Sequence, residues 1–208
     1  MKIIKLILIL GILIFLVFVF GKSFLSAQLA EIEGISSEEY SYGGENAEIK
    51  GNVIICKEGV ENCKIQITPK AGGEAIDLEL TPGTNYDPIS GKISVSSSGA
   101  SFKIGDKNFS HIDSGNFILN QNTGEIIEAK FTTTSEGGIY NLGVVSFSAA
   151  SGEVDFNLDK GSLSLPKESV LEDFDKYLFF EKLKNNSLIV DGENLKISDN
   201  LFNKIFFS

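Results

Sequence analysis

Apolar and polar residues alternate in short runs from Ala47 to Leu165. Runs such as KIQITP, AIDLEL and EVDFNL place an apolar side chain at every second position, which is the period of a strand with one buried face. Glycine-containing pairs such as SG, TG and KG separate the runs and indicate turns. No part of residues 47–165 keeps a helical period over ten residues. The pattern therefore predicts an all-β domain.

A glycine-led phrase returns at an even spacing within this region. GKISVS begins at Gly91, GNFILN at Gly115, GIYNLG at Gly138 and GSLSLP at Gly161, so the steps are 24, 23 and 23 residues. The residues two and four places after each glycine are all apolar: Ile93, Val95, Phe117, Leu119, Tyr140, Leu142, Leu163 and Leu165. An even repeat favours a β-solenoid with coils of about 23 residues, in which these eight side chains point into the core.

An antiparallel β-sandwich is the alternative architecture, because any alternating strand after a glycine turn gives the same short phrase. In the solenoid interpretation residues 47–208 are one β domain, with repeated coils at 88–165 and a disulfide hairpin at 47–87 that caps one end. Residues 166–208 are then a C-terminal cap or the start of a further region. Apolar residues at helical spacing predict a short amphipathic helix within 167–184; they are Val170, Leu171, Phe174, Tyr177 and Leu178.

The first thirty residues have the pattern of an export segment. They contain three lysines and no acid, and Lys2 and Lys5 precede an uncharged, almost wholly apolar run at residues 6–21. A membrane span needs about 20 such residues, and no small-x-small cleavage site follows the run. Residues 1–30 are therefore either a signal peptide or an N-terminal membrane anchor, and the protein is expected to be extracytoplasmic. Residues 31–46, with five glutamates and no lysine, predict an acidic flexible linker.

Cys56 and Cys63 are the two cysteines of the chain. An even pair outside the cytoplasm favours a disulfide. β-branched runs on both sides of a loop that contains Gly59 predict a hairpin held together near its neck. Two cysteines and the single histidine, His111, do not make a zinc shell, so neither a metal nor another cofactor is predicted.

Charge and motif content exclude several function classes. All 18 basic residues are lysine and the net charge is −10, which argues against a nucleic-acid partner because phosphate binding needs clustered cations. Ser110 and His111 are adjacent, so on a strand their side chains would point to opposite faces and could not form a catalytic pair. The common nucleophile, phosphate-loop and zinc-protease motifs do not occur, and no catalytic residue is assigned.

The export segment, the glycine-led phrases and the lysine-only basicity resemble β-solenoid segments of uncharacterised exported surface proteins, over about residues 88–165. The resemblance implies a non-enzymatic surface or envelope protein, a structural or adhesive β scaffold. Its expected partners are cell-wall or surface glycans or another envelope protein, with the membrane contacted through residues 6–21 if they are retained.

Two other functions are compatible with a β-helix-like fold. Polysaccharide lyases and hydrolases share this fold, so a carbohydrate-active enzyme is the rival, with Asp106, Asp113 and Glu125 as candidate acid and base. The absence of arginine and tryptophan weakens this resemblance, because such enzymes commonly use both. A carbohydrate-binding module is the third candidate, and it would show exposed tyrosine or phenylalanine in a row on one face.

Overall fold

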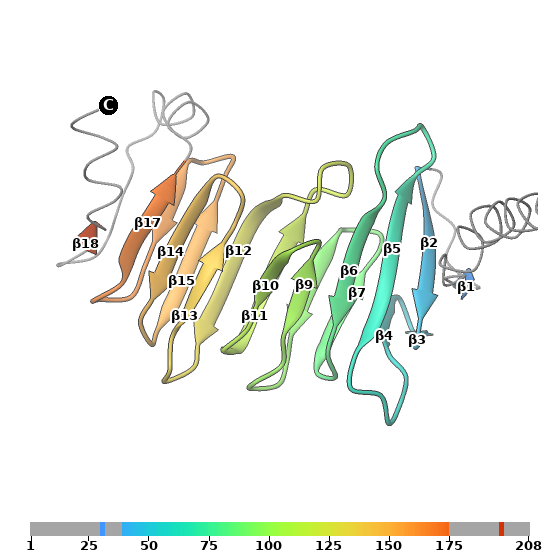
Figure 1. Ribbon diagram of the computed structural model, residues 1–208, viewed down its shortest axis with the longest axis horizontal. Coiled ribbons are helices and arrows are strands. Elements are labelled where there is room, and N and C mark those ends of the chain that lie inside the picture. Colours follow the sequence, from blue (N-terminus) through green and yellow to red (C-terminus); the bar gives the residue numbers. More distant parts are fainter. Residues whose placement is uncertain (1–29, 32–38, 175–195, 198–208) are drawn as a thin grey trace, which may run out of the picture. The chain divides into compact units, whose positions relative to one another are not determined.

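The computed structural model describes residues 30–31, 39–174 and 196–197, and all regular elements within these ranges are strands (Figure 1). The all-β prediction is confirmed for this part of the chain. The export segment at residues 1–30 lies almost wholly outside the described residues, and within them no helix is long and apolar enough to cross a membrane. The strands are β1 (Ala30–Glu31), β2 (Tyr40–Glu45), β3 (Ala47–Lys50), β4 (Val53–Cys56), β5 (Cys63–Pro69), β6 (Ile76–Leu80), β7 (Thr84–Asp87), β8 (Lys92–Val95), β9 (Phe102–Ile104), β10 (Lys107–Phe109), β11 (Ile112–Leu119), β12 (Ile126–Thr133), β13 (Gly138–Asn141), β14 (Val145–Ala149), β15 (Glu153–Asn157), β16 (Ser162–Ser164), β17 (Val170–Phe174) and β18 (Lys196–Ile197).

The strands form three sheets arranged in two layers. Sheet B has the order β16-β15-β12-β11-β8-β7-β4-β3, and it faces sheet A, which contains β2-β5-β6-β9-β10, and sheet C, which has the order β13-β14-β17-β18. The chain alternates between the layers, because each hairpin in sheet B is followed by a hairpin or strand in sheet A or C. Ring contacts join the layers, with Phe102 of β9 and Phe117 of β11 at 4.8 Å and Phe131 of β12 and Tyr140 of β13 at 4.9 Å between centroids.

One unbroken row of inward side chains crosses all eight strands of sheet B. Adjacent members of the row are opposite each other in the strand registers: Leu163, Phe156, Ala129, Phe117, Ile93, Tyr86, Ile54 and Ile49. All of them except Ile49, at the edge strand, are buried. The row follows from the period-2 alternation of the sequence, and each large member stabilises the fold by roughly 1.5–3 kcal/mol.

The eight side chains of the glycine-led phrases are all buried, at most 4% exposed, but the phrases do not begin successive coils. β8 and β11 are antiparallel neighbours with Ile93 opposite Phe117, whereas Tyr140 lies on sheet C and Leu163 on the edge strand of sheet B. Every described pairing from β2 to β17 is antiparallel. A solenoid with 23-residue coils is therefore not what the described residues form, and the β-sandwich-like class fits.

The spacing misled because the four glycines have different roles. Gly91 and Gly161 close hairpin turns, whereas Gly115 lies inside β11. The turns of the four sheet B hairpins contain Gly51, Gly91, Gly124 and Gly161, all with positive φ. Their separations are 91−51 = 40, 124−91 = 33 and 161−124 = 37 residues. The structural unit is one hairpin in each layer, and it is longer and less even than the 23-residue repeat.

The predicted disulfide is present, but the hairpin around it is not. Cys56 ends β4 in sheet B and Cys63 begins β5 in sheet A, so the bond joins the two layers. β4 pairs with β3 and β7, while β5 pairs with β2 and β6. Alternating runs on both sides of a short loop look the same in the sequence whether the chain reverses within one sheet or crosses to the other.

Two further segments differ from their sequence-based assignments. Tyr40–Glu45, placed in the acidic linker, forms strand β2 along β5, with Tyr42 in the core. Val170–Phe174, placed in a helix, forms strand β17 along β14, and the remainder of 167–184 after Phe174 lies outside the described residues. In both segments the pattern is short, and the neighbouring strand decides the conformation.

Candidate functional site

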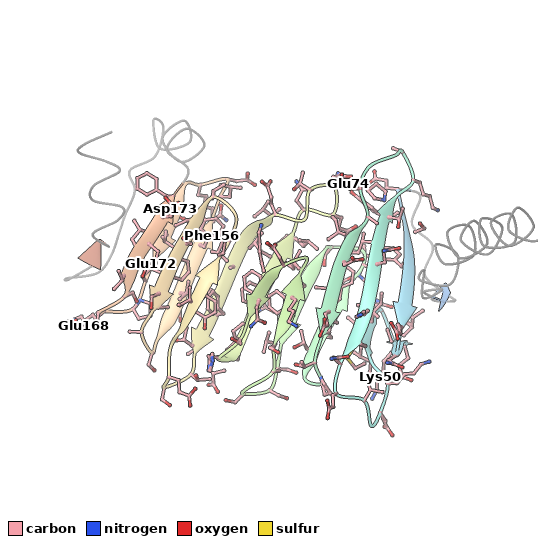
Figure 2. The ribbon with its side chains drawn as sticks, in the orientation of Figure 1. Lys50, Glu74, Phe156, Glu168, Glu172 and Asp173 are labelled. Atoms are coloured by element: carbon pink, nitrogen blue, oxygen red, sulfur yellow. A yellow bond between two sulfur atoms is a disulfide. The ribbon has the colours of Figure 1, made fainter. Side chains whose placement is uncertain are left out.

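The hairpin turns that follow β5, β9, β11 and β13 gather at one edge of the layered domain, which we call the turn edge. The crossovers between the layers lie at the opposite edge, because both ends of each hairpin are connected there to strands of the other layer. In Figure 2, Glu74 of the β5–β6 turn and Asp173 near the end of β17 lie at the upper edge, and Glu168, in the crossover between β16 and β17, lies lower. Polar turn residues that are distant in sequence therefore meet.

A hollow of about 500 Å³ lies at this edge, between the β5–β6, β9–β10 and β11–β12 turns. We call it the turn-edge groove. Its polar side chains are Glu74, Asp77, Asp106, Lys107, Asn122 and Thr123. Asp77 is held in place, since its Oδ1 accepts a hydrogen bond from Gln66 Nε2 at 3.0 Å and its carbonyl accepts one from the Gly105 N–H at 2.9 Å. The groove can offer carboxylate and amide groups to a polar ligand.

A smaller hollow of about 270 Å³ is lined by the β13–β14 turn and by Asp173 and Phe174. It adjoins the groove around Gly143. A Cβ built on Gly143 would lie 3.7 Å from Lys107 Nζ and 3.9 Å from Glu125 Cγ. Lys107, which lines the groove, and Glu125 therefore lie close to Gly143 of the smaller hollow.

The structure places two of the three carboxylates considered for sugar cleavage on the same edge of the domain. Asp106 lines the turn-edge groove, and Glu125 lies beside it, where its Oε2 accepts a hydrogen bond from Thr123 Oγ1 at 3.2 Å. Asp113 lies near the start of β11, six residues before Leu119, which places it roughly 20 Å along the strand from the turn edge. A glycosidase pair is about 5–10 Å apart, so Asp113 cannot act with the other two.

Ser110 and His111 lie in the crossover between β10 and β11 and not on a strand, so the argument from strand alternation does not apply to them. The Ser110 carbonyl accepts a hydrogen bond from the Tyr140 hydroxyl at 2.9 Å. His111 has a φ of 57° and its Nδ1 lies 3.0 Å from Glu136 Oε2, with both side chains largely exposed. Within residues 30–31, 39–174 and 196–197, no three histidine, cysteine or carboxylate side chains come together in a group that could hold a metal ion.

A buried polar network beneath the turns was not anticipated from the sequence. The Tyr42 hydroxyl donates a hydrogen bond to the Pro88 carbonyl at 2.8 Å, and Gln121 Nε2 donates to the same carbonyl at 2.9 Å. Burial raises the pKa of the Tyr42 hydroxyl to about 12 and also raises the pKa of Tyr86. The Tyr86 hydroxyl is buried and has no hydrogen bond of acceptable geometry within the described part of the chain. The network fixes the β7–β8 and β11–β12 turns against β2.

The outward faces of the two layers differ in chemistry. On sheet A the central cross-strand row alternates in charge: Glu45, Lys64, Glu79, Lys103 and Asn108. The corresponding row on sheet B begins with small neutral residues: Asn85, Ser94, Asn116, Lys130, Asp155 and Ser164. A second row lies two residues along each strand: Asp87, Lys92, Ile118, Glu128, Asn157 and Ser162. The sequence contained the signal for these rows, because their residues occupy the positions that alternate with the buried apolar residues of each strand.

Comparison of the chain with protein-family models, with curated proteins and with solved structures found no match. The candidate surfaces are therefore the turn-edge groove and the outward face of sheet B, argued from their own residues.

Proposed function

We propose that the protein is an exported, non-enzymatic β scaffold of the cell surface or envelope. The observation that carries the proposal is the unbroken core row from Leu163 to Ile49, which runs through all eight strands of sheet B. Each hairpin packs on its neighbours and on the facing layer, so the strands form one continuous sheet whose members stabilise one another. Such a body suits the display of extended surfaces.

The export part of the proposal rests on the acid-free N-terminal segment and on the disulfide. A bond between Cys56 and Cys63 is compatible with an extracytoplasmic location, where thiols are oxidised. It ties β4 to β5 across the two layers, and closing a loop of this length stabilises a fold by roughly 2–3 kcal/mol in the loop-entropy model. A cross-layer bond near the first strands suits a protein that has to persist outside the cell.

A carbohydrate-active enzyme is the second candidate, and one observation favours it. Asp106 lines the turn-edge groove and Glu125 is bonded to Thr123, which also lines it, so a sugar in the groove could approach two carboxylates. The scaffold proposal predicts that the groove does not support turnover.

Location and turnover test the two candidates together. The full-length chain would be expressed in a host with a secretory pathway, fractionated, and treated with a thiol-alkylating reagent. We expect it outside the cytoplasm with neither cysteine alkylated until a reductant is added. Purified protein would then be incubated with a panel of polysaccharides, and no sugar should be released.

Two outcomes would contradict the proposal. The first is a soluble cytoplasmic protein with both thiols alkylated without reductant. The second is sugar release that Asp106→Asn or Glu125→Gln abolishes while Asp113→Asn does not, since Asp113 lies at the other end of β11. That result would establish the enzyme.

A further inference from the structure

The outward face of sheet B carries polar side chains in two cross-strand rows. The rows cross six strands, from β7 to β16, and contain the twelve residues named above. Adjacent strands are about 4.7–4.9 Å apart, so each row is roughly 24 Å long. Ile118 is the one apolar member, and the rows contain no tyrosine or phenylalanine, so this face lacks the aromatic row expected of a carbohydrate-binding module and could hold a ligand only through its polar groups. We call this surface the sheet B face.

Cross-strand hydrogen bonds order this face. Ser94 Oγ donates to Asn116 Oδ1 at 2.9 Å, and Asn157 Nδ2 donates to Glu128 Oε2 at 3.2 Å. Lys130 Nζ lies 2.9 Å from Glu153 and 3.5 Å from Asp155. Side chains that are already fixed lose less conformational entropy when a ligand binds.

Unused donors remain on the β7 and β11 strands of this face. Asn116 uses its carbonyl oxygen for Ser94, and its amide N–H groups have no partner in the described part of the chain. Asn85, two strands away in the same row, likewise makes no side-chain hydrogen bond within the described residues. With two strand steps between them, the two amides are about 9.5 Å apart. They can therefore hydrogen-bond to successive units of one extended molecule.

Charge restricts what that molecule can be. The twelve residues of the two rows include three acids and two lysines, so the face carries −3 + 2 = −1, and the whole chain carries −10. An anionic polymer would be repelled. A protein partner would need apolar or aromatic anchors, and the rows contain Ile118 alone. A neutral polyhydroxylated chain fits, because its hydroxyl groups both donate and accept, as amides and serines do.

We propose that the sheet B face binds a neutral, linear polysaccharide laid across the strands, with the side chains of Asn85 and Asn116 as its central hydrogen-bonding groups. The proposal extends the surface-scaffold function. It rests on that function because a protein at the cell surface is where such a polymer would be encountered. Sheet A would not share this role, because its central row alternates between acids and lysines and satisfies its own charges, as the Lys103–Glu79 pair at 3.6 Å does.

Co-sedimentation of the purified full-length protein with polysaccharide particles tests the proposal. The probes are cellulose, chitin and β-1,3-glucan as neutral polymers, and polygalacturonate as an anionic one. We expect retention on at least one neutral polymer and none on polygalacturonate. The double variant Asn85→Ala/Asn116→Ala should weaken retention roughly tenfold, because two hydrogen bonds are lost. Asn108→Ala makes the same change at an exposed position on the outward face of sheet A and should leave retention unchanged.

The midpoint of urea unfolding would be measured for each variant, and a double variant that unfolds earlier would be replaced by Asn116→Ala alone. The proposal is overturned if no neutral polymer retains the protein, or if Asn108→Ala and the double variant weaken retention equally. It is also overturned if the double variant abolishes self-association of the protein in sedimentation without affecting retention, since the face would then be a protein interface. Location and sugar release are separate measurements. Retention that depends on Asn116 supports this inference even where sugar release shows the non-enzymatic function to be wrong.

Discussion

Replacing Phe117 by alanine tests the shared core of the two layers. Phe117 is fully buried on β11. Its ring centroid lies 4.8 Å from that of Phe102, 5.7 Å from that of Phe109 and 4.9 Å from that of Phe131. Phe102 and Phe109 belong to sheet A, and Phe131 belongs to sheet B. The substitution therefore removes contacts within one layer and between both.

The expected loss of unfolding free energy is about 3–5 kcal/mol, the range for truncating a buried phenylalanine to alanine. Favourable ring pairs of this kind contribute about 0.5–1.5 kcal/mol each, so the upper half of the range is expected. With a urea dependence of about 2 kcal/mol per molar, a loss in this upper half should lower the unfolding midpoint by roughly 2–2.5 M.

The assay is equilibrium urea unfolding of the full-length, disulfide-intact chain, followed by circular dichroism. Ile139→Ala is the control, because Ile139 is also a large apolar strand residue but is 74% exposed, and its loss should stay within about 0.5 kcal/mol. The two-layer arrangement is refuted if Phe117→Ala loses less than about 1 kcal/mol, or if both variants lose the same amount.

Three further predictions concern single features of the fold. Gly115→Ala should cost about 1–3 kcal/mol, because its Cβ would overlap the Cβ of Phe131, and urea unfolding measures the loss. Cys56→Ala/Cys63→Ala should lower the unfolding free energy by roughly 2–3 kcal/mol, and the wild-type chain under reductant should show the same loss; equal stability with and without reductant would contradict it. Burial raises the pKa of Tyr42 from 10.0 to about 12, so its contribution to stability is complete below pH 10 and is lost as the pH rises towards 12. Tyr42→Phe should reduce that alkaline loss in pH-dependent urea unfolding, and an unchanged pH profile would exclude Tyr42 as its source.

Alternation alone predicts much of the fold. KIQITP coincides with β5 and EVDFNL with β15, and in both strands every second side chain is buried. The same period explains why all eight residues of the glycine-led phrases are in the core, although they belong to two different layers. A strand that packs one face on a core has this pattern in any all-β architecture, so the pattern determines which residues are inside but not which strands are neighbours.

Strand neighbours could not be predicted because glycine has more than one use. Gly91 allows a turn with positive φ, while Gly115 is small because Phe131 occupies the space above it. The sequence does not distinguish these roles, and counting both as turns produced the 23-residue repeat. The same limit applies to Cys56 and Cys63, since their spacing predicts the bond but not that the bond joins two sheets.

The two candidate surfaces differ in how far the sequence determines them, and this difference helps to assign function. The sheet B face is the polar half of the alternation, so Asn116 is outward once Phe117 is inward. The turn-edge groove depends on three turns, and Asp106 and Asn122 line the same hollow only because the hairpins alternate between layers. Asn116→Ala and Asp106→Asn therefore report on different surfaces. Binding lost through Asn116 alone assigns the ligand to the face and favours a scaffold, whereas binding and turnover lost through Asp106 alone assign it to the groove and favour an enzyme.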